Sequence, residues 1–190
     1  MRFKIKWQGK TPLLCNRFTD EAQLKATSGI GIASVGNMKT PYAQAEEKLY
    51  IGHDGKPMIP QPNVFRCIID AGKFFKNGKS KVTTLSSSLI PACVEVEGIE
   101  FPIAHKDPWE VDTRAVRIPS TGGRILCHRP KFNDWALSFE ATLDTELMSK
   151  ELFRDIIDSA GRRIGLGDFR PDRKGPFGKF VVVSWKESKG

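Results

Sequence analysis

Cysteine motifs and long apolar segments are both missing from this sequence. The four cysteines, Cys15, Cys67, Cys93 and Cys127, are far apart, form no C-x-x-C pair, and three of them lie within apolar runs. This pattern favours buried, reduced thiols over zinc ligands or disulfides and indicates an intracellular protein. No segment is apolar for long enough to span a membrane, so we expect no membrane partner. Residues 1–7 alternate charged and apolar side chains, whereas a signal peptide needs a continuous apolar run, so we expect a cytoplasmic location.

Histidine is scarce, and motifs for metal-dependent or nucleophilic catalysis are missing. His53, His105 and His128 are scattered, and none stands in an H-E-x-x-H frame. We therefore expect no metal, no cofactor and no catalytic residues. One enzymatic alternative stays open, a metal-independent endoribonuclease in which Asp20 or His128 acts in general acid/base catalysis. Such catalysis needs a positioned set of groups that the sequence does not display, which favours a protein that is not an enzyme.

Positive charge is what the sequence has in excess. Its 190 residues include 30 Lys and Arg against 22 Asp and Glu, which gives a net charge of +8 at pH 7 and a pI of about 9.4. An excess of this kind favours a polyanionic partner such as nucleic acid, although net charge carries no information about the fold. The length suits a single domain, which we assign to residues 1–190.

Two periodicities alternate along the chain. Phe3, Ile5 and Trp7 alternate with polar residues as in a half-buried strand, and residues 135–143 repeat this period of two. Apolar residues recur at helical spacing after Pro62 and again after Ser149, which suits a helix N-cap. The chain therefore predicts a strand, a helix, a strand and a second helix as its clearest elements.

Shorter apolar runs complete the predicted fold. We expect strands at 89–96 with a hairpin partner at 98–103, at 111–118 paired with 124–129, at 180–185 with both faces buried, and a small hairpin from 49–51 and 57–60. The order of elements predicts an α+β fold with a ferredoxin-like, RRM-like core, βαββαβ. Two additions interrupt it: a flexible insertion after the first strand at residues 19–47, and an extra β-hairpin within residues 98–131.

Residues 160–180, between the last helix and the last strand, combine glycines with cations. Glycine allows positive φ and close approach of another backbone, so this glycine-rich loop is expected to present amide N–H groups and cations to an anionic chain. The alternative interpretation is a helix C-cap followed by a long solvated turn. A Walker A loop needs Ser or Thr after Gly178-Lys179, and a dinucleotide fingerprint needs glycine at Arg170, so neither motif fits.

Cations next to aromatic residues predict binding of a single strand, because cations follow the phosphates while aromatic faces stack on bases. No strand shows the exposed aromatic pair of a conventional RRM platform. The candidate nucleic-acid-binding residues therefore come from the 111–131 hairpin and from the glycine-rich loop. They are Arg114, Arg117, Arg124, Arg129, Lys131, Arg162, Arg163, Gly165, Gly167, Phe169, Arg170, Arg173, Lys174, Gly175, Phe177, Gly178 and Lys179.

Two glycine clusters of this loop carry a family resemblance. Gly165-Leu166-Gly167 and Gly175-Pro176-Phe177-Gly178 resemble, with slightly stretched spacing, the G-x-G-x-x-x-x-x-G-x-G loop that RAMP superfamily proteins share before their last strand. The segment Gly9-Lys10-Thr11-Pro12-Leu13-Leu14 is similar to the start of the repeated CRISPR backbone subunit, the Cas seven-type member. Both ends also resemble a group of uncharacterised bacteriophage proteins. The resemblance implies an RRM-like fold with insertions and a phage origin, hence the host cell cytoplasm.

These observations lead to three hypotheses. The first is a protein that binds single-stranded DNA or RNA through the loop and the hairpin and assembles along the strand as a homo-oligomer or filament. The second is a protein-interaction module that mimics a CRISPR backbone subunit, interferes with host defence and contacts a host or phage protein through residues 19–47. The third is the metal-independent endoribonuclease.

Overall fold

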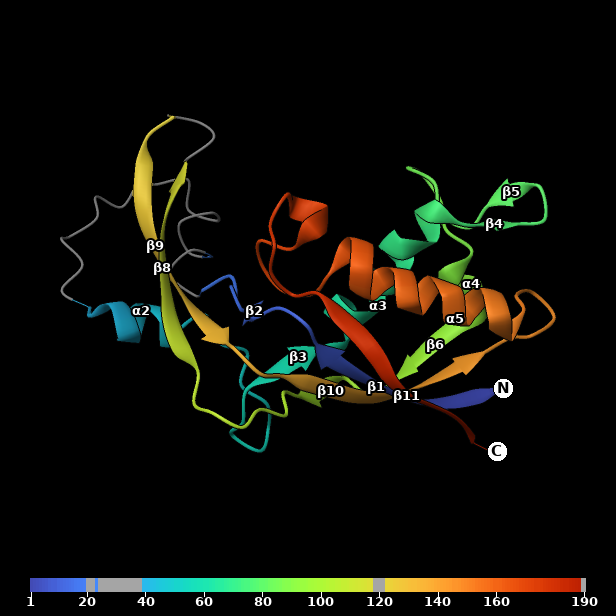
Figure 1. Cartoon of the computed structure of the whole chain (residues 1–190), viewed down its shortest axis with the longest axis horizontal. Helices are drawn as coiled ribbons and strands as arrows, with labels where there is room; N and C mark the ends of the chain where they lie inside the picture. Colours follow the sequence, from blue (N-terminus) through green and yellow to red (C-terminus); the bar gives the residue numbers. More distant parts are fainter. Residues whose placement is uncertain (20–22, 24–38, 118–121, 189–190) are drawn as a thin grey trace.

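The structure, a computed structural model, describes residues 1–19, 23, 39–117 and 122–188. Its core elements are, in chain order, β1 (Arg2–Gly9), α3 (Gln61–Ala71), β6 (Val94–Glu97), β10 (Ala136–Leu143), α5 (Lys150–Ser159) and β11 (Phe180–Ser188). Within the described residues the strands form a four-stranded sheet in the order β11-β1-β10-β6, with all neighbours antiparallel. Helices α3 and α5 cover one face of this sheet (Figure 1).

This strand order identifies the fold class. Counted along the chain, the four core strands lie in the order fourth, first, third, second, so that two βαβ units interleave. This is the ferredoxin-like plan. The α+β, RRM-like prediction is therefore confirmed.

Buried and exposed side chains alternate along β1, and the buried ones form part of the hydrophobic core between sheet and helices. Phe3, Ile5 and Trp7 point toward the helices and are at most 2% exposed, whereas Lys4 and Lys6 are exposed on the open face. The Trp7 ring is stacked on Phe180 with 4.0 Å between centroids. Burial of such side chains is the main source of stability for this layer.

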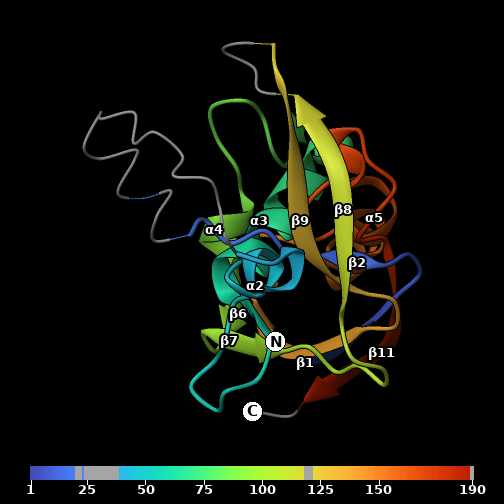
Figure 2. The ribbon, with the colours of Figure 1, turned by 90° about the vertical axis from the view of Figure 1, so that its left-hand side faces the viewer.

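A second antiparallel sheet stands at one end of the core (Figures 1 and 2). It has the order β2-β9-β8, with β2 (Leu13–Leu14), β8 (Glu110–Arg117) and β9 (Arg124–Phe132). Strands β8 and β9 form the predicted long hairpin, in register from Glu110 opposite Lys131 to Arg117 opposite Arg124. Helix α2 (Pro41–Glu46) packs against both strands.

Short elements fill the connections. Two-stranded pairs are β3 (Met58–Pro60) with β7 (Glu100–Pro102) and β4 (Lys76–Asn77) with β5 (Ser80–Lys81). Single turns are α4 (Ile90–Cys93), η1 (Gly72–Phe74), the π-helical η2 (Ala160–Ile164) and η3 (Pro171–Arg173). No helix in the described part of the chain is both long and apolar enough to cross a bilayer.

Three local predictions were wrong. The expected strand 89–96 begins with the helical turn α4, because Pro91 suits the first turn of a helix, and only its second half is β6. Residues 100–102 pair with β3 and not with β6. Strand β11 is not buried on both faces: it is the edge of its sheet, and Val183 is 54% exposed.

The predicted insertion at 19–47 falls largely on residues 20–22 and 24–38, which lie outside the described residues. Its described end is α2, where Tyr42 stacks on Trp109 with 4.5 Å between ring centroids. The interaction module proposed for this segment stays a prediction.

Candidate nucleic-acid interface

The glycine-rich loop is closed on itself and on the connection between β1 and β2. The amide of Leu166 donates to the carbonyl of Gly178 at 2.9 Å, Gly178 donates to Pro12 at 2.8 Å, and Asp168 donates to Leu14 at 2.8 Å. These amides therefore hold the loop in place. The expectation that the loop presents its amides to an anion is wrong for these three groups, because each already has a carbonyl partner.

The glycines of the loop are explained by backbone contact. A Cβ at Gly178 would lie 1.8 Å from the Leu166 carbonyl oxygen, and one at Gly175 would lie 1.8 Å from that of Phe169. Gly178 also has a φ of +69°, a conformation that favours glycine. Gly165 and Gly167 share a φ of +75° and are similarly enclosed. These four glycines therefore determine the shape of the loop, and any contact with a ligand is made by the side chains of other loop residues.

Arg129 is a structural residue of the hairpin. Its side chain is 5% exposed, and its Nη1 lies 2.7 Å from Asp168 Oδ2 while its Nη2 lies 3.5 Å from Asp112 Oδ2. The prediction of an exposed phosphate-binding cation at this position is therefore corrected: the guanidinium is buried and joins β9 to the glycine-rich loop. A buried charge needs such partners, because desolvation without them is very costly.

Arg114 and the loop aromatics form the neighbouring contact. The Arg114 guanidinium lies 4.9 Å from the centroid of the Phe177 ring, and its Nε also lies within 3.0 Å of both Asp112 oxygens. Phe177 is 8% exposed and packs 6.0 Å from Phe169, centroid to centroid. Phe177 is therefore held inside the loop and is not free to stack on a base, whereas half-buried Phe169 is partly accessible.

Asp172 collects several of the predicted cations. Its carboxylate lies 2.7 Å from Lys73 Nζ, 3.8 Å from Arg170 Nη2 and 3.9 Å from Arg173 Nε. The hydrogen bond from Lys73 lowers the pKa of Asp172 below its ordinary value, against an opposing effect of burial. Three cations around one carboxylate leave an excess of positive charge on this part of the loop.

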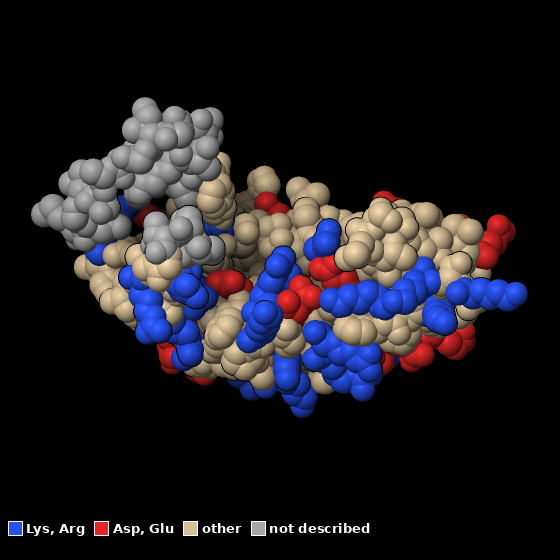
Figure 3. Space-filling view, turned by 90° about the horizontal axis from the view of Figure 1, so that it is seen from above, with Lys and Arg blue, Asp and Glu red and all other residues tan. Residues whose placement is uncertain are grey.

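The remaining loop cations are exposed. Arg162 and Arg163 project from η2, and the Arg163 guanidinium lies 4.8 Å from the centroid of the Phe74 ring. Arg162, Lys174 and Lys179 are all exposed. Among the described residues, Arg162 and Lys174 have no ion-pair partner. Lysine and arginine side chains follow one another along this side of the molecule, with acidic residues between them (Figure 3).

The hairpin tip lies apart from the loop. Arg117 and Arg124 face each other across the far end of β8 and β9, beside the exposed side chains of Ile125 and Leu126. Figures 1 and 2 show this end projecting away from the core. The structure therefore brings together Arg114 and the loop residues but leaves these two arginines at a distance from them.

Two further predicted positions have local partners. Lys131 Nζ pairs with Glu110 across the strands at 2.9 Å. His128 is 9% exposed, and its Nδ1 lies 2.8 Å from Thr113 Oγ1. Asp20, the other residue of the ribonuclease hypothesis, lies outside the described residues. That hypothesis gains no geometric support from the described residues.

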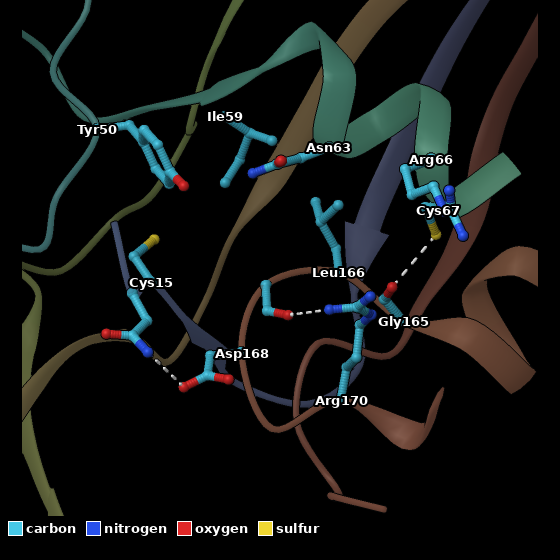
Figure 4. Close-up of a pocket in the computed structure, with 12 residues that line it drawn as sticks. Cys15, Tyr50, Ile59, Asn63, Arg66, Cys67, Gly165, Leu166, Asp168 and Arg170 are labelled. Atoms are coloured by element: carbon cyan, nitrogen blue, oxygen red, sulfur yellow. Dashed lines mark hydrogen bonds between the residues drawn. The ribbon is translucent and has the colours of Figure 1, made fainter. Parts of the chain in front are cut away.

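A pocket of about 230 Å³ opens between α3, the glycine-rich loop and the residues after β2. Sequence reasoning missed the residues that line it from outside the loop, among them Asn16, Tyr50, Asn63 and Arg66 (Figure 4). A signal for two of them was present: Asn63, Arg66 and Asp70 recur at helical spacing between buried positions of α3. Such a polar stripe usually means solvent, so it did not identify a site.

The two cysteines of the pocket are neutral thiols. Burial raises the pKa of Cys15 to about 12, and it also raises the pKa of Cys67. The Cys67 thiol donates a hydrogen bond to the carbonyl of Gly165 at 3.2 Å. Both residues therefore pack as small apolar groups and do not act as nucleophiles at neutral pH.

Comparison with known proteins gives a likeness of fold. No protein-family model matches the chain, and no curated protein matches its sequence. Among solved structures it is similar to a chain in the cryo-EM structure of the Type III-B Cmr-beta bound to cognate target RNA, with a TM-score of 0.51 and 14% identity. The match covers 97% of this chain and 59% of that one, so this protein spans somewhat over half the length of its structural neighbour.

We predict that Gly178→Ala destabilises the protein far more than Gly55→Ala. Both glycines have positive φ, but a Cβ at Gly55 meets nothing within 4 Å, whereas one at Gly178 meets a carbonyl. Strain alone costs about 1–2 kcal/mol, and overpacking adds about 1–3 kcal/mol. Urea unfolding measures both variants, and equal losses of stability would contradict the closed loop.

A second prediction concerns pH. Because the folded pKa of Asp172 is lowered, its pairing with Lys73 stabilises the fold above the unfolded pKa, and this contribution is lost as pH falls through the folded pKa. Lys73→Ala should cost about 0.2–1 kcal/mol at pH 7 and progressively less below pH ~4. Unfolding at several pH values measures this difference, with Lys76→Ala, an exposed neighbouring lysine, as the control. A cost that is independent of pH would contradict the assignment.

Proposed function

We propose that this protein binds single-stranded nucleic acid, specifically RNA, along the side that carries the glycine-rich loop and the middle of the β8–β9 hairpin, around Arg114. The observation that carries the proposal is the fixed proximity of Arg114 to the loop, with the guanidinium 4.9 Å from the Phe177 ring. Cations from two distant parts of the chain thereby line one surface. A row of this kind follows phosphates without reading sequence.

Charge and exposure support this surface over the open face of the sheet. The loop side carries Arg162, Arg163, Arg173, Lys174 and Lys179, all exposed. On the open face, Arg2 and Lys4 pair with Glu140, and the described strands present no exposed aromatic side chain there. A single strand needs cations and accessible ring faces, so the loop side is favoured.

The structural neighbour supports RNA as the partner, since it belongs to a Cmr-beta complex bound to cognate target RNA. On this basis we also propose that the chain is a RAMP-like protein and that copies assemble side by side along the strand. Its free cysteines, three of them buried, support the further proposal that it acts in the reducing cytoplasm. The bacteriophage origin and the mimicry of a CRISPR subunit stay predictions of the sequence resemblance.

We predict that removal of two loop cations weakens the affinity for single-stranded nucleic acid by a defined amount. Arg173→Gln with Lys174→Asn should weaken binding of a single-stranded oligonucleotide about tenfold near 0.1 M salt and reduce the salt slope by about 1.4. Fluorescence anisotropy at two or more salt concentrations, with single-stranded and duplex oligonucleotides, measures both effects. Asparagine is used at position 174 because the φ there is +60°.

The matched control removes the same charge from the other side of the sheet. Lys6→Gln with Lys186→Gln alters two exposed lysines on the open face of β1 and β11 and should leave affinity nearly unchanged. An equal loss of affinity in this control would indicate that the nucleic acid binds on the open face of the sheet. Absence of binding by the wild type at low salt would refute the proposed function.

A further inference from the structure

We propose that the pocket between α3 and the glycine-rich loop receives one nucleobase of the bound strand, turned out of the stack. This inference rests on the proposed function and adds to it a base-specific site beside the phosphate-binding surface. The pocket volume of about 230 Å³ is below the range of roughly 300–1,000 Å³ that suits drug-sized ligands. A single ring system is therefore a suitable occupant.

Part of the pocket wall is apolar, although polar side chains also line it. Ile59, Leu166 and Cys15 line it and are each at most 2% exposed. The ring of Tyr50 lies across the space from Leu166, with Ile59 and Cys15 on the same side as Tyr50 (Figure 4). An aromatic face opposed to aliphatic groups is the environment in which flipped bases are held by nucleic-acid enzymes.

Polar groups with unused hydrogen-bonding capacity point into the same space. The amide of Asn63 and the hydroxyl of Tyr50 both project toward the pocket, and neither side chain forms a hydrogen bond with another described residue (Figure 4). An asparagine amide offers both donors and an acceptor, and a phenol offers one donor and acceptor. Together they match the mixed donors and acceptors at the edge of a base.

Charges in the pocket wall are already compensated. The Asp168 carboxylate accepts hydrogen bonds from Arg129 at 2.7 Å, from Asn16 at 3.1 Å and from the amide of Phe169 at 2.9 Å. Burial raises the pKa of both the Cys15 and the Cys67 thiol, which favours their uncharged form. The interior therefore suits an uncharged ring better than a phosphate.

The rim of the pocket connects it to the phosphate-binding surface. Arg170 lines the pocket and belongs to the same cluster around Asp172 as Arg173. Arg66, at the rim on α3, has a side chain that is 69% exposed, and it pairs with Asp70 at 3.0 Å. A strand that follows the loop cations thus passes the opening, with Arg66 next to its backbone.

The experiment compares an oligonucleotide that carries bases with one of equal length whose sites are all abasic. We expect wild-type protein to bind the base-containing strand about tenfold more tightly, in keeping with the contribution of a single well-held base. Asn63→Ala and Tyr50→Leu should each lose about five- to tenfold on that strand and remain unchanged on the abasic strand. Asn133→Ala, at an exposed asparagine that does not line the pocket, should change neither affinity.

Each outcome separates this inference from the proposed function. Tight binding of both strands by the wild type, with no effect of Asn63→Ala, would overturn the pocket and leave the phosphate-binding surface standing. Equal weakening on both strands would show that Asn63 acts through the fold and would also overturn the pocket. Absence of binding to either strand would refute both proposals. Asn63→Trp, which fills the pocket from the half-buried face of α3, should reproduce the loss on the base-containing strand.

Discussion

The ion pair between buried Arg129 and half-buried Asp168 fixes the arrangement on which the interface depends. Arg129 comes from the hairpin strand β9, Asp168 from the glycine-rich loop, and the two atoms lie 2.7 Å apart. Because a buried guanidinium that lost its partner would be strongly destabilising, hairpin and loop are constrained to one relative position. That constraint places Arg114 over the loop and encloses the pocket beside it.

Hydrogen-bonded carboxylates and close glycine contacts also hold the glycine-rich loop in one position. Asp172 holds Lys73, Arg170 and Arg173 in one cluster, where one negative charge against three positive leaves an excess of two. The glycines let the loop backbone pack against its neighbours, so the cations extend from a fixed base. A fixed array loses less conformational entropy on binding than a flexible one.

The sequence predicted what depends on periodicity and missed what depends on tertiary contact. The alternation in β1 and β10 and the cap at Ser149 define the ferredoxin-like core, and the long hairpin follows from β-strand patterning. No local pattern shows that Arg129 turns inward, since exposed and buried arginines look alike until their partners are placed. The pocket is equally non-local, because residues from α3, the loop and the segment after β2 meet only in the fold.

The most direct measurement of the central claim is photo-crosslinking of a thiouridine-labelled single-stranded RNA to the protein, followed by mass spectrometry of the attached peptides. We expect crosslinks within residues 160–179 and in the middle of strand β8, around Arg114. Crosslinks confined to the open face of the sheet, in peptides from β1 and β10, would contradict this claim.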